Sequence, residues 1–231
     1  MTASEHRELA RGALSGRWGL AIGTGLVASA LIGGASFSFS FPANFGNESF
    51  YESFNHLSNE EIMAFIAIML SVFAAAFAIA FIAGSLYGIF SSIIQAGYCS
   101  FNLKLIDYEE PAFRDLFSQF RNAKSIIVAY LLRFAFELIG YMLFIVPGII
   151  ISYNYAMVPY ILADDPTVSA KEALRMSKEM MYGNRWRLFC LQFSFIGWIL
   201  LTVLSFGVGS IWLTPYQNAA LASFYRELKP F

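Results

Sequence analysis

Charged positions are distributed very unevenly along the chain. No Asp, Glu, Lys or Arg lies between Arg17 and Glu48, between Glu61 and Lys104, between Glu137 and Asp164, or between Arg187 and Arg226. Each of these gaps is longer than the roughly 20 apolar residues that span a bilayer. The pattern therefore predicts apolar membrane helices joined by charged loops.

Dividing the gaps by their turn residues gives six expected crossings. They are residues 18–39, 62–106, 125–146, 149–163, 188–206 and 210–225. The fourth is short and follows Pro147-Gly148. Pro159 should kink it near its end, because proline has no backbone donor. The expected fold class is an all-α, polytopic membrane helix bundle in which residues 1–231 form a single domain.

The segment 62–106 is long enough for one bent helix or for two crossings. Small residues recur there at every fourth position, which favours one helix with a close neighbour. They are Ala76, Ala80, Gly84, Gly88, Ser92, Ala96 and Ser100. With one crossing, every basic residue except Arg133 falls on the cytoplasmic side together with both termini, as the positive-inside rule expects. Two crossings would export two basic loops, so one helix is preferred.

Two segments outside the crossings have amphipathic patterns. Residues 1–17 predict an interfacial helix with Leu9, Ala10, Ala13 and Leu14 on its apolar side and His6, Arg7, Arg11 and Arg17 on its polar side. Residues 164–187 predict a cytoplasmic helix that starts with a Ser169–Glu172 capping box and stops near Gly183.

Composition supports lipid as the main solvent of the chain. Of its 231 residues, 58% are hydrophobic and 13% are charged, whereas soluble domains carry about 25% charged residues. The net charge of −1 gives a nucleic-acid partner no electrostatic support. Cys99 and Cys190 are expected as buried single thiols, and His6 and His56 have no companions at metal-ligand spacing. We therefore expect no metal and no cofactor.

Four segments together resemble a known family. They are GYCSFNLKLIDYEEPAFRDLFSQF, VPGIIISYNYAMVPYILADDP, SKEMMYGNRWRLFCLQFSFIGWILL and GVGSIWLTPYQNAALASFY. In order and spacing, from about Leu9 to Tyr225, they resemble the bacterial integral-membrane family called domain of unknown function 975. The resemblance implies a multi-pass protein of the bacterial cytoplasmic membrane, distantly similar to the membrane domain of some glycerophosphodiester phosphodiesterases. It implies no activity.

Polar residues inside the expected crossings are the first candidate site. Arg133 and Glu137 share a helix face at spacing four and can pair, and charges inside a bilayer usually face protein or water. Asn154 is expected to bond across to Gln192 or Gln95. The alternative interpretation is a polar cavity, lined by Arg133, Glu137, Tyr153, Asn154, Tyr155 and Gln192.

Basic residues of the 164–187 loop are the second candidate site. Lys171, Arg175, Lys178, Arg185 and Arg187 are expected either to anchor the topology or to bind lipid headgroups. No motif of a known enzyme class is present. The leading function is therefore a non-enzymatic membrane protein that binds or moves a lipid-like or amphipathic ligand, or serves as an accessory subunit. The rival is a small-solute or ion transporter acting around Arg133, Glu137 and Asn154.

Partners are expected within the membrane. Membrane lipids are the first. A second copy of the chain or another membrane subunit is the alternative, because Gly25, Ser29 and Gly33 form another small-residue ridge in the first crossing.

Overall fold

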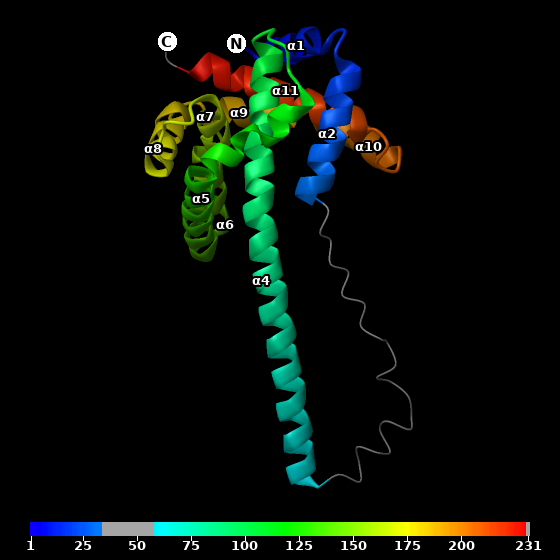
Figure 1. The fold of residues 1–231 in the computed structure, drawn as a ribbon, viewed down its shortest axis with the longest axis vertical. Coiled ribbons are helices and arrows are strands. Elements are labelled where there is room, and N and C mark those ends of the chain that lie inside the picture. The colour runs from blue at the N-terminus through cyan, green and yellow to red at the C-terminus, as the bar shows by residue number, and fades with distance from the viewer. Residues whose placement is uncertain (34–57, 230–231) are drawn as a thin grey trace. The chain divides into compact units, whose positions relative to one another are not determined.

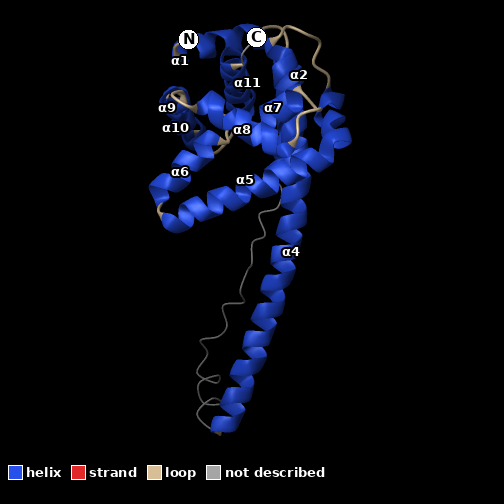
Figure 2. Cartoon of the chain, turned by 90° about the vertical axis from the view of Figure 1, so that its left-hand side faces the viewer, coloured by secondary structure: helices blue, strands red, loops and turns tan. Residues whose placement is uncertain are grey.

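The computed structural model describes residues 1–33 and 58–229, and within those ranges it contains helices and loops but no strand (Figures 1 and 2). The all-α prediction is confirmed for this part of the chain. Residues 34–39 of the first expected crossing, and His56, lie outside it. The helices are α1 (Ala3–Leu14), α2 (Trp18–Gly33), α4 (Asn59–Ile106), the 3-10 helix η1 (Phe113–Asn122), α5 (Ala123–Leu143), α6 (Ile145–Asn154), α7 (Val158–Asp164), α8 (Ala170–Met181), α9 (Arg185–Phe193), α10 (Ile196–Leu204) and α11 (Ser210–Leu228).

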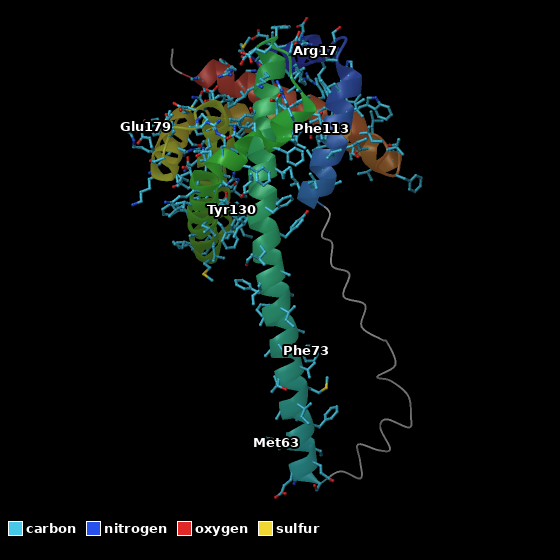
Figure 3. The ribbon with its side chains drawn as sticks, in the orientation of Figure 1. Arg17, Met63, Phe73, Phe113, Tyr130 and Glu179 are labelled. Carbon is cyan, nitrogen blue, oxygen red and sulfur yellow. The ribbon has the colours of Figure 1, made fainter. Side chains whose placement is uncertain are left out.

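Contacts divide the chain into two compact units, residues 35–88 and the remainder. In the smaller unit, the described residues form the first part of α4, which Ser58 caps by accepting a hydrogen bond from the Glu61 backbone N–H at 3.4 Å. Large apolar side chains such as Met63 and Phe73 are exposed along it (Figure 3). Phe77 is 73% exposed. Such an exposed apolar surface is typical of a segment that contacts lipid or another protein.

Further helices of the described structure also support a membrane protein. Among the described residues, four helical stretches are long and apolar enough to cross a bilayer: Asn59–Ile106, Phe113–Leu143, Ile145–Asp164 and Arg185–Leu204. The segment expected as one long helix is one helix, α4. The apolar part of α2, Trp18–Ile32, is shorter than a crossing needs. The total number of crossings stays a prediction.

Helix α11 packs against several helices of the larger unit. Its buried side is rich in small residues, Ala219, Ala220, Ala222 and Ser223, which let neighbouring helices approach closely. Helix α1 crosses over it, and α2 also packs on it (Figures 1 and 2). The residues expected as a sixth crossing are thus largely enclosed by other helices of this unit.

Gly97 permits a close contact between α4 and η1. A Cβ at this position of α4 would lie 1.9 Å from the backbone oxygen of Leu116 in η1. Only glycine leaves room for that approach. Beside it, Lys104 of α4 pairs with buried Asp115 of η1 at 2.7 Å, so packing and charge together hold η1 against α4.

Pro159 has a stronger effect than the kink expected from the sequence. Helix α6 ends at Asn154 and α7 begins at Val158, so the helix is interrupted. Proline cannot donate to the backbone four residues earlier, and its ring clashes there. The Ser177 hydroxyl of α8 donates to the Asn154 carbonyl at 2.7 Å and accepts from the Met157 N–H at 3.3 Å. One buried side chain thus satisfies two backbone groups of the interruption.

The two amphipathic helices differ in how well their patterns predict burial. In α8, Ser169 caps the first turn, Ala173, Leu174, Ser177 and Met181 are buried, and Gly183 follows at φ 79°. In α1, the assignment of His6 to the polar side is wrong, since His6 is 1% exposed, and Leu9 is 37% exposed. The reason is that α1 packs on α11, where Ser223 and Glu227 supply polar partners for the imidazole.

Candidate ligand-binding cleft

The structure pairs the two charges expected inside the membrane. Arg133 Nε donates to Glu137 Oε1 at 2.8 Å along α5. Beside Arg133 lies a hollow of only about 30 Å³, bordered by Gln95 of α4 and Pro159 of α7. That volume leaves room for only a few water molecules, since one water needs roughly 10–15 Å³ of such space. The arrangement is an ion pair next to a small space.

The remaining residues of the expected polar cavity are dispersed. Tyr153 donates from its hydroxyl to Gln192 Oε1 at 2.7 Å, and Tyr155 stacks on Phe136 with ring centroids 5.7 Å apart. Asn154 is buried, and its side-chain oxygen has no partner among the described residues. The expected bond from Asn154 to Gln192 or Gln95 is absent from the bonds of the described residues. The structure therefore joins Tyr153 to Gln192, while Arg133 lines a separate hollow.

The five basic residues expected at lipid headgroups have different surroundings. Arg175 is held by Glu172 at 2.5 Å and by Glu179, the residue labelled on α8 in Figure 3, at 3.2 Å. Arg187 pairs with Glu227 at 2.5 Å. Lys171 and Lys178 are exposed.

Arg185 lines a groove of the described structure. The groove holds about 180 Å³ and is otherwise bordered by Ile149, Ile150, Tyr153, Trp186 and Phe189. The Nε of Arg185 is buried without a partner in the described part of the chain. Of the basic residues in the 164–187 loop, Arg185 is therefore the one best placed to meet an anionic group beside apolar side chains.

Another hollow of the described structure involves residues that the sequence did not single out as a site. It holds about 720 Å³, within the roughly 300–1,000 Å³ typical of small-molecule sites. We call it the tryptophan cleft. Its lining comprises Arg11, Trp18, Trp198, Leu201, Thr202, Ser205, Gly209, Trp212, Leu213 and Tyr216, from α1, α2, α10, α11 and the turn between α10 and α11.

Two helix faces with the same spacing form its main walls. Trp198, Leu201, Thr202 and Ser205 follow positions i, i+3, i+4 and i+7 along α10 and its end, and Gly209, Trp212, Leu213 and Tyr216 repeat that spacing along α11. Residues at these spacings share one helix face. Helix α10 has no buried residue. The hollow therefore lies along a helix that packs only lightly on the rest of the larger unit.

The turn between α10 and α11 forms one end of the cleft. Phe206 and Gly207 take positive φ values of 51° and 88°. The Ser205 hydroxyl accepts from the Gly209 N–H at 3.0 Å and donates to the Thr202 carbonyl at 3.0 Å, and the Thr202 hydroxyl donates to the Ile199 carbonyl at 2.7 Å. These hydroxyls are satisfied within the wall, so the wall offers a ligand mainly apolar contacts.

Arg11 supplies charge at the opposite end. From Ser205 to Trp198 the α10 wall extends for about 10 Å at 1.5 Å per residue, and Trp198 borders Arg11. The Arg11 guanidinium lies 5.9 Å from the centroid of the Tyr216 ring, within cation–π range, and donates to its hydroxyl at 3.4 Å. The cleft is thus apolar along its length and cationic at one end.

A second, polar hollow of about 280 Å³ adjoins this end. Its lining is Ser4, Arg7, Glu8 and Arg11 of α1 with Trp198 of α10. Arg11 and Trp198 therefore belong to both hollows. The Nε of Arg7 is buried without a partner in the described part of the chain.

A separate ionic cluster connects the first and last helices of the larger unit. His6 Nε2 lies 2.9 Å from Glu227 Oε2, and Glu227 also pairs with Arg187. Burial lowers the pKa of His6, although Glu227 opposes the change. Burial would raise the pKa of Glu227, but hydrogen bonds from the amino terminus and Arg187 outweigh it, and the pKa falls. These groups are paired with one another, so the cluster is structural.

No metal centre is evident in the part of the chain that the structure describes. It contains no group of three or more His, Cys, Asp and Glu side chains arranged to hold an ion. Cys99 and Cys190 are both free thiols.

Comparison with known proteins supports the family resemblance over part of the chain. Residues 138–230, from α5 to the C-terminal end of α11, match the model described as "Protein of unknown function (DUF975)". Neither the curated proteins nor the solved structures contain a significant match. Similarity to the membrane domain of glycerophosphodiester phosphodiesterases stays a prediction. The matched region includes α10 and α11, hence both main walls of the tryptophan cleft, but not Arg11 or Trp18.

Proposed function

We propose that this membrane protein binds a lipid-like, amphipathic molecule in the tryptophan cleft, without enzymatic chemistry. The observation that carries the proposal is an apolar hollow of about 720 Å³ that has a guanidinium at one end. An amphipathic molecule has the same division into an apolar tail and a polar head. We further propose that the chain resides in the bacterial cytoplasmic membrane with both termini cytoplasmic, as the distribution of basic residues indicates.

The apolar part of the cleft suits an acyl chain. Trp18, Trp198 and Trp212 provide broad rigid surfaces, and tryptophan prefers the region where apolar and polar surroundings meet. A chain entering from the bilayer leaves one apolar environment for another, so the hydrophobic effect contributes little to its affinity. Selectivity must therefore come from shape and from the polar end.

The polar end suits a phosphate-bearing headgroup. Arg11 makes no ion pair with a described carboxylate, and its long contact with the Tyr216 hydroxyl leaves most of its five donors free. A guanidinium binds phosphate oxygens in a planar, two-pronged geometry. An anionic headgroup at Arg11 with its tail along α10 and α11 uses both parts of the cleft.

The rival function, solute or ion transport around Arg133, Glu137 and Asn154, has less support in the geometry. The two charges are already paired, and the adjacent hollow holds about 30 Å³. Accessory binding to another membrane subunit is compatible with a lipid-filled cleft and is the second candidate, because the exposed apolar side chains of α10 offer a contact surface.

A photoreactive phospholipid with a diazirine in its acyl chain tests the proposal in proteoliposomes. After irradiation, we expect labelled peptides to concentrate within residues 196–216. Leu201→Trp places extra volume in the cleft and should reduce that labelling severalfold. Leu200→Trp is the matched control, since Leu200 is similarly exposed (60%, against 55% for Leu201) but does not line the cleft. Labelling spread in proportion to exposed surface, and equal in both variants, would refute the proposal.

A further inference from the structure

The polar hollow beside the tryptophan cleft contains charges of both signs. Ser4, Arg7, Glu8 and Arg11 follow positions i, i+3, i+4 and i+7 of α1 and therefore share one face. Two guanidiniums and one carboxylate thus border a space of about 280 Å³. Because Arg11 also lines the apolar cleft, the two hollows adjoin at this residue.

These charges do not neutralise one another. Among the described residues, no ion pair joins Glu8 to Arg7 or Arg11, although the i, i+3 spacing of Glu8 and Arg11 would allow one. Arg7 instead donates to the Ser194 carbonyl at a long 3.4 Å. Its Nε is buried and has no acceptor among the described residues.

We propose that the ligand is a phospholipid with a zwitterionic headgroup, whose phosphate faces Arg7 and Arg11 and whose ammonium faces Glu8. This inference rests on the proposed function and specifies its ligand class. A purely anionic headgroup would satisfy the arginines but would meet the uncompensated carboxylate of Glu8. A zwitterion provides a partner for both signs at once.

The preference for a zwitterionic over an anionic phospholipid should be moderate, because Glu8 is exposed. Exposed ion pairs contribute little, so we expect the carboxylate to change relative lipid retention by about two- to fivefold. Glu8→Gln removes the charge and keeps the shape of the side chain. Glu110→Gln makes the same charge change at an exposed position between α4 and η1, outside the hollow.

Native mass spectrometry of the full chain in detergent tests the inference with an equimolar mixture of phosphatidylethanolamine and phosphatidylglycerol. The wild type and Glu110→Gln should retain more phosphatidylethanolamine, and Glu8→Gln should reduce that ratio two- to fivefold. Preferential retention of phosphatidylglycerol, or a ratio unchanged by Glu8→Gln, would overturn the proposal of a zwitterionic ligand. Neither result would overturn the proposal of lipid binding in the tryptophan cleft. If neither lipid is retained, or if Leu201→Trp leaves retention of both unchanged, the proposed function itself fails.

Discussion

Ser177 provides the sharpest test of the interrupted helix α6–α7. Its side chain is fully buried, and its hydroxyl bonds the Asn154 carbonyl and the Met157 N–H. Ser177→Ala removes both bonds and adds no bulk. Water cannot readily replace the hydroxyl, because Asn154 and Met157 are themselves 8% and 1% exposed. The substitution therefore leaves two backbone groups without partners.

Two magnitudes bound the expected loss. A buried backbone group left unsatisfied costs about 1–3 kcal/mol, whereas interhelical hydrogen bonds in membrane proteins average about 0.6 kcal/mol. The 2.7 Å bond to Asn154 is short and should lie near the upper value, and the 3.3 Å bond from Met157 near the lower. The sum predicts a destabilisation of about 2–4 kcal/mol.

Unfolding in mixed micelles with increasing dodecyl sulfate, followed by tryptophan fluorescence, measures this free energy. Ser118→Ala is the control, because the Ser118 hydroxyl donates to the Asp115 carbonyl at 2.7 Å on an exposed part of η1. Ser118→Ala should lower the free energy of unfolding by no more than about 0.5 kcal/mol. A loss for Ser177→Ala no larger than that of the control would refute the role given to Ser177.

Three further predictions use the same unfolding measurement. Gly97→Ala should lower the free energy of unfolding by about 3 kcal/mol or more, because its Cβ would lie 1.9 Å from the Leu116 oxygen. Gly19→Ala is the control, since its Cβ would have no atom within 4 Å, and it should change stability by less than about 1 kcal/mol. Equal effects of the two substitutions would contradict the close contact. In a double-mutant cycle of Arg133→Leu and Glu137→Leu, each single variant should lower the free energy of unfolding by about 2–3 kcal/mol, and the double variant should lower it by less than their sum. Additive losses would mean that the pair does not interact. The free energy of unfolding should fall as the pH drops below 6.5 and again below 4.5. The folded-state pKa values of His6 and Glu227 lie below those ordinary values, so the unfolded chain takes up protons first. His6→Gln should remove the fall below pH 6.5, and an unchanged pH profile in this variant would contradict the burial argument.

Much of the architecture follows from the sequence because lipid imposes simple rules. The charge-free gaps indicate the apolar helices, and the small-residue ridge favours one helix over residues 62–106, where α4 lies. The ends of α8 could also be predicted from the sequence, since Ser169 caps α8 and Gly183 follows it with a positive φ. Such features depend on neighbours within one or two helical turns.

The tryptophan cleft could not be predicted in this way. Trp18, Trp198 and Trp212 are three of the four tryptophans, and they meet only because α2 and α10 both lie against α11. A usable signal was present: the spacing of Trp198, Leu201, Thr202 and Ser205 is repeated by Gly209, Trp212, Leu213 and Tyr216 across the turn. His6 was misjudged for the same reason, because its partners Ser223 and Glu227 are near the other end of the chain.

An experimental structure of the chain in lipid nanodiscs containing phosphatidylethanolamine tests the central claim most directly. We predict an elongated density along the α10 and α11 walls, between Trp198 and Trp212, with its head at Arg11. A cleft closed by direct contact of α10 with α11, or ordered lipid elsewhere on the surface with none in the cleft, would contradict ligand binding there.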